Sequence, residues 1–185
     1  MAGTYYGSTC DDNIVDPECT LCVDDYELSG IGSAAVIHKT YYPTLIANPT
    51  SYAVWLAGIQ AGHIKIIPNI RGEFDGGSPK YGQGYGRRVN TYLGAEYKGK
   101  LYDANYIENA LFYDSIAPTS NWHVAITSET QVHISKNPVT FSPTNPITDD
   151  IQKAIEWVTE FTFQQQGLVI PYTYPAGIFD CAYAV

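Results

Sequence analysis

Residues 155–163, IEWVTEFTF, form the longest alternation of side chains in the chain. One face of this stretch would carry Ile155, Trp157, Thr159, Phe161 and Phe163, and the other Glu156, Val158, Glu160 and Thr162. A period of two with aromatic and β-branched residues is typical of a strand that buries one face. A helix over residues 149–157 (DDIQKAIEW) is the alternative, since that stretch begins with two acids and contains good helix formers. We expect a strand from Ile155 onward.

Other strands are predicted on the N-terminal side of this stretch. Residues 89–97 alternate well, with Val89, Thr91, Leu93, Ala95 and Tyr97 on one face. The remaining candidates are residues 33–39, residues 63–70 with Ile64 and Ile66 on one face, and a proline-punctuated strand and turn over residues 137–146.

A hairpin is predicted from residues 122–126 and 130–134, with residues 127–129 as its loop. In that register Trp122 faces Ile134 and Val124 faces Val132. The same register places His123 opposite His133 on the other face. A cross-strand histidine pair can bind a metal, but no third ligand lies nearby in the sequence, so we interpret the pair as surface or interface residues that could respond to pH in an assembly.

Two helices are predicted. In residues 48–62, NPTSYAVWLAGIQAG, Asn48 is a good N-cap, Pro49 suits the first helical position and Gly62 ends the helix. Its apolar stripe would be Tyr52, Trp55, Leu56 and Ile59, which we expect to pack against a sheet. Residues 103–116 form the second candidate, with a buried side of Tyr106, Ile107, Ala110, Leu111 and Tyr113.

A long loop, RGEFDGGSPKYGQGYGRR (residues 71–88), is predicted between the strands at 63–70 and 89–97. It is rich in Gly and Tyr and has no apolar run that could form a core, and loops of this length in a compact domain usually serve a function. The organisation is therefore one β domain over residues 31–163 with about seven strands and two helices. An N-terminal arm (residues 1–30) and a C-terminal arm (residues 164–185) would flank it, the latter laid against a neighbour.

Charge is distributed unevenly along the 185 residues, whose formal net charge is −9. Residues 1–30 contain seven acids and no Lys or Arg, while the rest of the chain is nearly balanced. No basic footprint for reading duplex DNA is present. Charged residues are scarce at 16%, and sixteen tyrosines offer large rigid surfaces of the kind enriched at protein interfaces. A tyrosine-rich β domain that stands alone is the alternative interpretation.

No apolar stretch reaches the roughly 18 residues that a membrane helix needs, so we expect no membrane contact. The start, MAGTYYGSTC, has neither a basic region nor an apolar core, and we expect synthesis in a cytosol without a secretory signal. The four cysteines are Cys10, Cys19, Cys22 and Cys181. We expect free thiols, and the alternatives are a disulfide and a zinc knot that joins the termini.

The chain shows no set of residues typical of catalysis. Gly82, Gly84 and Gly86 form a GxGxG run, but Arg87 and Arg88 lead from it into a strand, whereas a phosphate-binding loop leads into a helix. The neighbouring carboxylates at residues 11–12, 24–25 and 149–150 would point to opposite faces of a strand or lie in turns. We therefore expect no enzyme activity, no cofactor and no metal site.

Three stretches carry a resemblance to a known family: GEFDGGSPKYGQGYG, WHVAITSETQVHISKNPVTFSPTNPITDD and the closing PAGIFD. Over residues 33–180 these stretches make the chain similar to structural proteins of tailed phages infecting Bacteroidetes, including crAss-like phages. The order of elements, a β domain with one packed helix, a long loop between strands and extended termini, resembles the tail-tube type of phage virion protein. The acidic arm and the cysteines depart from that plan.

The resemblance implies a mainly β, α+β fold, an antiparallel sandwich with one packed helix, a long inter-strand loop and extended arms. It implies a structural subunit that assembles with identical subunits into rings of the tail, tail tube or head–tail region. Such rings would contact neighbouring virion proteins and let DNA pass through the lumen without sequence recognition. The protein would be localised in the virion after assembly in the host cytoplasm.

The long loop and the C-terminal arm are the expected contacts between subunits, with Tyr81, Tyr85, Arg87 and Arg88 as anchors. The alternatives are a capsid-decorating subunit and a carbohydrate-binding sandwich. The latter is weakened because Trp55, Trp122 and Trp157 all fall on predicted core faces, which leaves only tyrosines for stacking on sugars.

Overall fold

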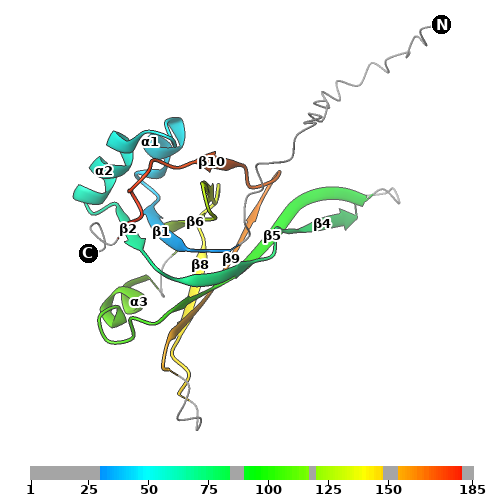
Figure 1. Ribbon diagram of the computed structural model, residues 1–185. Helices are drawn as coiled ribbons and strands as arrows, with labels where there is room; N and C mark the ends of the chain where they lie inside the picture. The colour runs from blue at the N-terminus through cyan, green and yellow to red at the C-terminus, as the bar shows by residue number, and fades with distance from the viewer. Residues whose placement is uncertain (1–29, 84–89, 117–119, 148–153, 181–185) are drawn as a thin grey trace, which may run out of the picture.

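Two antiparallel five-stranded sheets pack face to face in the computed structural model, which describes residues 30–83, 90–116, 120–147 and 154–180 (Figure 1). Within these residues the chain forms ten strands and three helices, more than the sequence predicts. In chain order they are β1 (Ser33–His38), α1 (Tyr42–Ala47), α2 (Tyr52–Gln60), β2 (Ile64–Ile67), β3 (Arg71–Phe74), β4 (Ser78–Gln83), β5 (Asn90–Asp103), α3 (Ala110–Ile116), β6 (Trp122–Thr127), β7 (Gln131–Ile134), β8 (Thr140–Thr144), β9 (Trp157–Gln165) and β10 (Pro171–Thr173). The expectation of a mainly β sandwich is confirmed at this level.

The first sheet has the order β10-β7-β6-β1-β2 and is covered on both faces. Its central strands are apolar almost throughout, because successive side chains point to opposite, equally buried sides. Ala34 and Val36 of β1 face the second sheet, while Ala35 and Ile37 face the helices. The predicted strands at residues 33–39 and 63–70 are confirmed by β1 and β2.

The second sheet has the order β3-β5-β9-β8, and β4 also pairs with β5. The alternation predicted for residues 155–163 is confirmed from Thr159 onward: Thr159, Phe161 and Phe163 are buried, whereas Glu160 and Thr162 are exposed. Its predicted start is wrong, since β9 begins at Trp157 and Ile155 is 38% exposed. The described residues cover only the inner face of this sheet. Its outer face carries polar and charged side chains.

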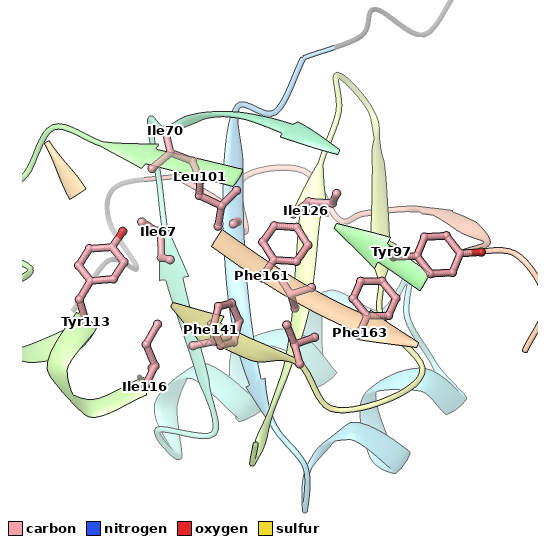
Figure 2. Packing of buried hydrophobic residues seen from close by; sticks show 14 of the residues in the cluster. Ile67, Ile70, Tyr97, Leu101, Tyr113, Ile116, Ile126, Phe141, Phe161 and Phe163 are labelled. Carbon is pink, nitrogen blue, oxygen red and sulfur yellow. The ribbon is translucent and has the colours of Figure 1, made fainter. Parts of the chain in front are cut away.

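Aromatic rings fill the space between the sheets (Figure 2). Phe161 and Phe163 of β9 stack with Phe74 of β3, with ring centroids 6.2 and 6.3 Å apart, and Tyr97 of β5 stacks on Phe163 at 5.0 Å. Gly99 lies opposite Phe161 in the register of β5 and β9. Its missing side chain leaves room for the Phe161 ring, since a Cβ there would lie 2.1 Å from Phe161 Cζ.

A layer of helices covers the other face of the first sheet (Figure 1). Trp55 of α2 is fully buried there, and its indole N–H donates to the Pro49 carbonyl at 2.7 Å. The helix ends as predicted, with Gly62 at φ 73° just beyond it. Its predicted start is wrong: Asn48 caps the C-terminus of α1, and α2 begins after Ser51.

The predicted loop over residues 71–88 is wrong for ten of its first thirteen residues. Residues 71–74 and 78–83 form β3 and β4, which pair with successive parts of β5. Their alternation is hard to recognise because they lie at the edge of a sheet with one polar face, so few of their side chains enter the core. The turn between them is held by Asp75, whose carboxylate accepts hydrogen bonds from the backbone N–H groups of Gly77 and Lys98.

The predicted helix over residues 103–116 is reduced to α3, and its predicted buried side is confirmed for Tyr113 but wrong for Ile107 and Leu111. Tyr113 and Ile116 are 1% exposed, whereas Ile107 and Leu111 are 78% and 84% exposed. The reason lies in Asp103, which ends β5 and turns the chain through hydrogen bonds from the Asn105 backbone and the Asn109 side chain.

The predicted register of the 122–134 hairpin is wrong by three residues. Ala125 pairs with Ile134 and Ile126 with His133. The turn closes on Ser128, whose backbone N–H donates to the Gln131 carbonyl at 2.9 Å, and this displaces the loop toward the C-terminus. The predicted His123–His133 pair is therefore absent. His123 instead stacks on Tyr42 of α1, with ring centroids 3.9 Å apart.

The described part of the predicted C-terminal arm, residues 164–180, belongs to the domain itself. Strand β10 pairs with β7, and Tyr97 donates a 2.9 Å hydrogen bond to the Gly167 carbonyl. Ile178 is fully buried and Phe179 packs edge-on against Trp55. Ile178 and Phe179 thus belong to the helix-side core. Residues 1–29, which comprise nearly all of the predicted N-terminal arm, and all four cysteines lie outside the described residues.

Candidate assembly surface

A hairpin made of β4 and the first half of β5 extends past the sandwich (Figure 1). Its register pairs Tyr81 with Tyr92, and the two rings meet edge to face at 6.0 Å. Between the pairs Lys80–Gly94 and Tyr81–Tyr92, Leu93 has no partner of its own, so β5 carries a β-bulge. Gly94, with φ 115°, supplies the backbone conformation that this bulge requires.

The bulge decides which faces of the hairpin are apolar. At the bulge, two residues of β5 oppose one residue of β4. The side chain of Tyr92 therefore lies on the same face as those of Ala95 and Tyr97. Leu93 lies over Gly82 on the opposite face. The inner face of the second sheet therefore continues into the hairpin as Tyr81 and Tyr92. Nothing in the described part of the chain encloses them there.

Three apolar side chains of the hairpin are exposed to solvent. The exposed fractions are 61% for Tyr81, 45% for Tyr92 and 62% for Leu93. Tyrosine pairs of this kind are enriched at protein interfaces because a rigid ring loses little entropy on binding. We call these three side chains the hairpin patch, in which Tyr81 and Tyr92 share the inner face and Leu93 lies on the opposite face.

Of the four predicted contact residues, the structure places Tyr81 in this patch. Tyr85, Arg87 and Arg88 belong to residues 84–89, outside the described residues, and their role stays a prediction. Tyr92 and Leu93 were missed because strict alternation assigned Leu93 to the face of Ala95. The signal that could have identified them is Gly94, since an isolated glycine inside a strand pattern often marks a bulge.

The outer face of the second sheet is charged but locally neutral. Lys80 Nζ lies 2.7 Å from Glu96, Lys100 Nζ lies 2.8 Å from Glu160, and Arg71 lies 2.7 Å from Glu156. The hydrogen bond from Lys80 lowers the pKa of Glu96, and that from Lys100 lowers the pKa of Glu160. Each of these basic groups thus has a carboxylate beside it.

The edges of both sheets are further candidate contact sites. Strands β2 and β8 each pair on one side only within the described residues. Strand β8 contains Pro143 and β4 contains Pro79, a residue type that is confined in sheets to edges, strand starts and bulges. The two prolines therefore limit further strand pairing along β4 and β8.

Histidines and aromatic rings lie together at the C-terminal end of β1, which is His38. The ring centroid of His38 lies 6.2 Å from that of His63 and 5.0 Å from that of Trp122, which it meets edge-on. Tyr41 stacks on His63 with ring centroids 5.4 Å apart. Within the described ranges, no three His, Cys, Asp or Glu side chains are grouped so that they could hold a metal ion.

A cleft of about 420 Å³ opens between the sheets beside Phe74, Ile126 and His133. Its lining combines apolar side chains with four polar or charged residues, which are Glu73, Thr127, Ser128 and His133. No helix in the described residues is long and apolar enough to cross a membrane.

Comparison with known proteins gives no relative from which a role could be transferred. No family model matches the chain, and neither a curated protein nor a solved structure matches it.

Proposed function

We propose that the protein is a structural subunit of a phage particle that self-assembles into rings of the tail, tail tube or head–tail region and forms a conduit for DNA. The observation that carries this proposal is the hairpin patch, in which Tyr81, Tyr92 and Leu93 are exposed on a hairpin that extends past the sandwich. The resemblance over residues 33–180 supplies the class of particle.

Exposure of the hairpin patch to water costs free energy. An inner sheet face that continues beyond its covering sheet exposes aromatic area to water, at roughly 25 cal/mol for each Å² of apolar surface. Contact with another subunit would recover this free energy. The partners we propose are identical subunits in a ring and the neighbouring ring or tail proteins of the virion, which is also the proposed localisation.

The charge pattern supports passage of DNA without sequence recognition. Reading or gripping duplex DNA requires unpaired Lys and Arg side chains that replace counterions. On the outer face of the second sheet Lys80, Lys100 and Arg71 each lie beside a carboxylate. A duplex near this face would meet little net attraction.

The direct test is the mass of the purified full-length protein, measured by light scattering and mass photometry, followed by negative-stain imaging. We expect closed rings with a lumen. The variant Tyr81→Ser/Tyr92→Ser should reduce the ring fraction strongly. Tyr52→Ser, which alters a tyrosine of α2 that is 41% exposed, should leave it unchanged.

A monomer at all concentrations would overturn the proposal. A monomer that also binds in a glycan array would favour the carbohydrate-binding alternative instead. Oligomers that form only on added phage capsids would favour the capsid-decorating alternative.

A further inference from the structure

Two of the chain's four histidines lie directly opposite one another on neighbouring strands. His38 ends β1 and His63 immediately precedes β2, and they follow Ile37 and Ile64 as the next pair of the register. The His38 backbone N–H donates to the His63 carbonyl at 2.8 Å, which continues the ladder to this pair. Residues directly opposite in an antiparallel pair carry their side chains on the same face. We call His38 and His63 the histidine pair.

The two imidazole rings are close together and packed against aromatic neighbours. Their centroids are 6.2 Å apart and their planes are inclined by 29°. Tyr41 stacks on His63, and its hydroxyl donates to the Val54 carbonyl of α2 at 2.7 Å. Trp122 of β6 meets the His38 ring edge-on. Both histidines are only partly buried, so their rings remain accessible to an ion from solvent.

One ring nitrogen of His38 has a supporting partner. Nδ1 lies 2.8 Å from the Thr40 hydroxyl oxygen, which can accept a hydrogen bond from Nδ1–H. This tautomer leaves Nε2 with a free lone pair. A histidine that binds a metal almost always donates its other ring N–H to such a partner, which fixes the tautomer and the direction of the ring. His38 therefore has the support expected of a metal ligand.

The spacing of the rings suits one shared cation. Imidazole nitrogens bind Zn²⁺ at about 2.0–2.1 Å, which places the centroids of two rings on one tetrahedral ion roughly 5 Å apart. The histidine pair, at 6.2 Å, has to close by only about 1 Å to reach that geometry. No third His, Cys, Asp or Glu of the described residues joins the pair, so water is left to fill the other positions.

We propose that His38 and His63 form a binding site for a divalent transition-metal ion such as Zn²⁺ or Cu²⁺, both of which imidazole ligands suit. The sequence predicts no metal site, because the two histidines are far apart in it. The cross-strand pair that it does predict, His123 and His133, is separated in the structure, and the β1–β2 register brings together a different pair. This inference does not depend on the proposed assembly.

The ion would act on the layer of helices. Residues 39–62, which contain α1 and α2, lie between the two ligands, so the ion would join the two ends of this segment. The histidines are opposite one another only in the folded chain. A metal bound there should therefore stabilise the fold by mass action.

The first test is calorimetric titration of the full-length protein with Zn²⁺, together with thermal unfolding at each Zn²⁺ concentration. His38→Gln and His63→Gln should each weaken binding at least about tenfold, since even the loss of a group that supports a ligand has an effect of this size. Each should also remove most of the rise in melting temperature. His133→Gln is the matched control, because it alters another partly buried histidine of the same sheet and should change neither quantity.

Thiolates bind the same metals, so the titrations are repeated in a full-length chain with all four cysteines replaced by serine. The histidine-dependent binding should persist there. Cu²⁺ then serves as a second probe, since it quenches tryptophan fluorescence at short range. Trp122→Phe should remove most of the quenching, whereas Trp157→Phe should not. Electron paramagnetic resonance should show two imidazole nitrogens on Cu²⁺, and one in each His→Gln variant.

Three results would overturn the inference. Zn²⁺ affinity that both His→Gln variants retain would place the metal elsewhere. Binding that disappears with the cysteines would assign it to the thiols, and no binding at all would make the histidine pair an aromatic contact only. Circular dichroism verifies each fold, and His38→Asn replaces a Gln variant that does not fold. Particle mass measured in EDTA tests the proposed function separately, so a monomer that binds Zn²⁺ through the pair would overturn that proposal alone.

Discussion

The Tyr113 hydroxyl of α3 donates a 2.9 Å hydrogen bond to the carboxylate of Asp103, the last residue of β5, and both side chains are 1% exposed. Burial and the nearby carboxylate raise the pKa of Tyr113, so its hydroxyl stays protonated and remains a donor. A buried carboxylate without donors would be costly. This bond therefore couples the position of α3 to the end of the longest strand.

Tyr113→Phe should lower the free energy of unfolding by about 1–3 kcal/mol, because Asp103 loses one donor in a buried site. Urea denaturation followed by tryptophan fluorescence measures the change. The control is Tyr106→Phe, whose hydroxyl has only a 3.5 Å contact with Asn145 at an exposed site. Equal effects of the two substitutions would show that the buried bond contributes nothing specific.

His123 should make the protein less stable in mild acid. Burial lowers the pKa of His123 below its ordinary 6.5, against the opposing effect of the Ser135 carbonyl, so the unfolded chain binds a proton more readily than the folded one. The stabilisation of the folded protein by the neutral His123 ring is fully present above about pH 6.5. It is lost progressively as the pH falls from there to the lower pKa of the folded state.

The measurement is the urea midpoint between pH 8 and pH 5. His123→Gln should flatten its pH dependence, whatever its effect at neutral pH. His133→Gln alters a histidine that is only partly buried and should keep the slope of the unaltered protein. A slope that His123→Gln leaves unchanged would assign the acid sensitivity to other groups.

Gly99→Ala should destabilise the fold by about 1–3 kcal/mol through overpacking. The new Cβ would lie 2.1 Å from Phe161 Cζ and 2.9 Å from the Glu73 carbonyl oxygen, and the backbone atom cannot move aside easily. Gly32→Ala is the matched control, because a Cβ there meets nothing within 4 Å and the backbone does not have positive φ. Thermal unfolding compares the two, and similar melting temperatures would contradict the packing argument.

The sequence predicts this fold best where one face of a strand is buried. In β9 every second residue enters the core, so the alternation of Thr159, Phe161 and Phe163 identifies the strand directly. Edge strands β3 and β4 contribute few core residues, and their pattern is correspondingly weak. The 122–134 register depends on which residues close the turn, and the hydrogen bond from Ser128 to Gln131 is not visible in apolar periodicity.

The candidate site could be predicted only in part for a related reason. Tyr81 follows from the general enrichment of tyrosine at interfaces, whereas Leu93 depends on a one-residue bulge that reverses the faces of β5. Ile107 and Leu111 were assigned to a buried helix face because apolar residues at helical spacing are normally buried. The Asp103 interactions shift the start of α3, and with it the side that faces the protein.

The length of strand β5 has a consequence for a ring that is built through the hairpin patch. Strand β5 has fourteen residues and carries the hairpin past the sandwich, so its length sets the distance between the hairpin patch and the rest of the domain. At about 3.4 Å per residue, inserting two residues would lengthen that distance by roughly 7 Å while keeping every side chain on its own face. Ring diameter, and with it the width of the lumen, would then be encoded in the length of a single strand.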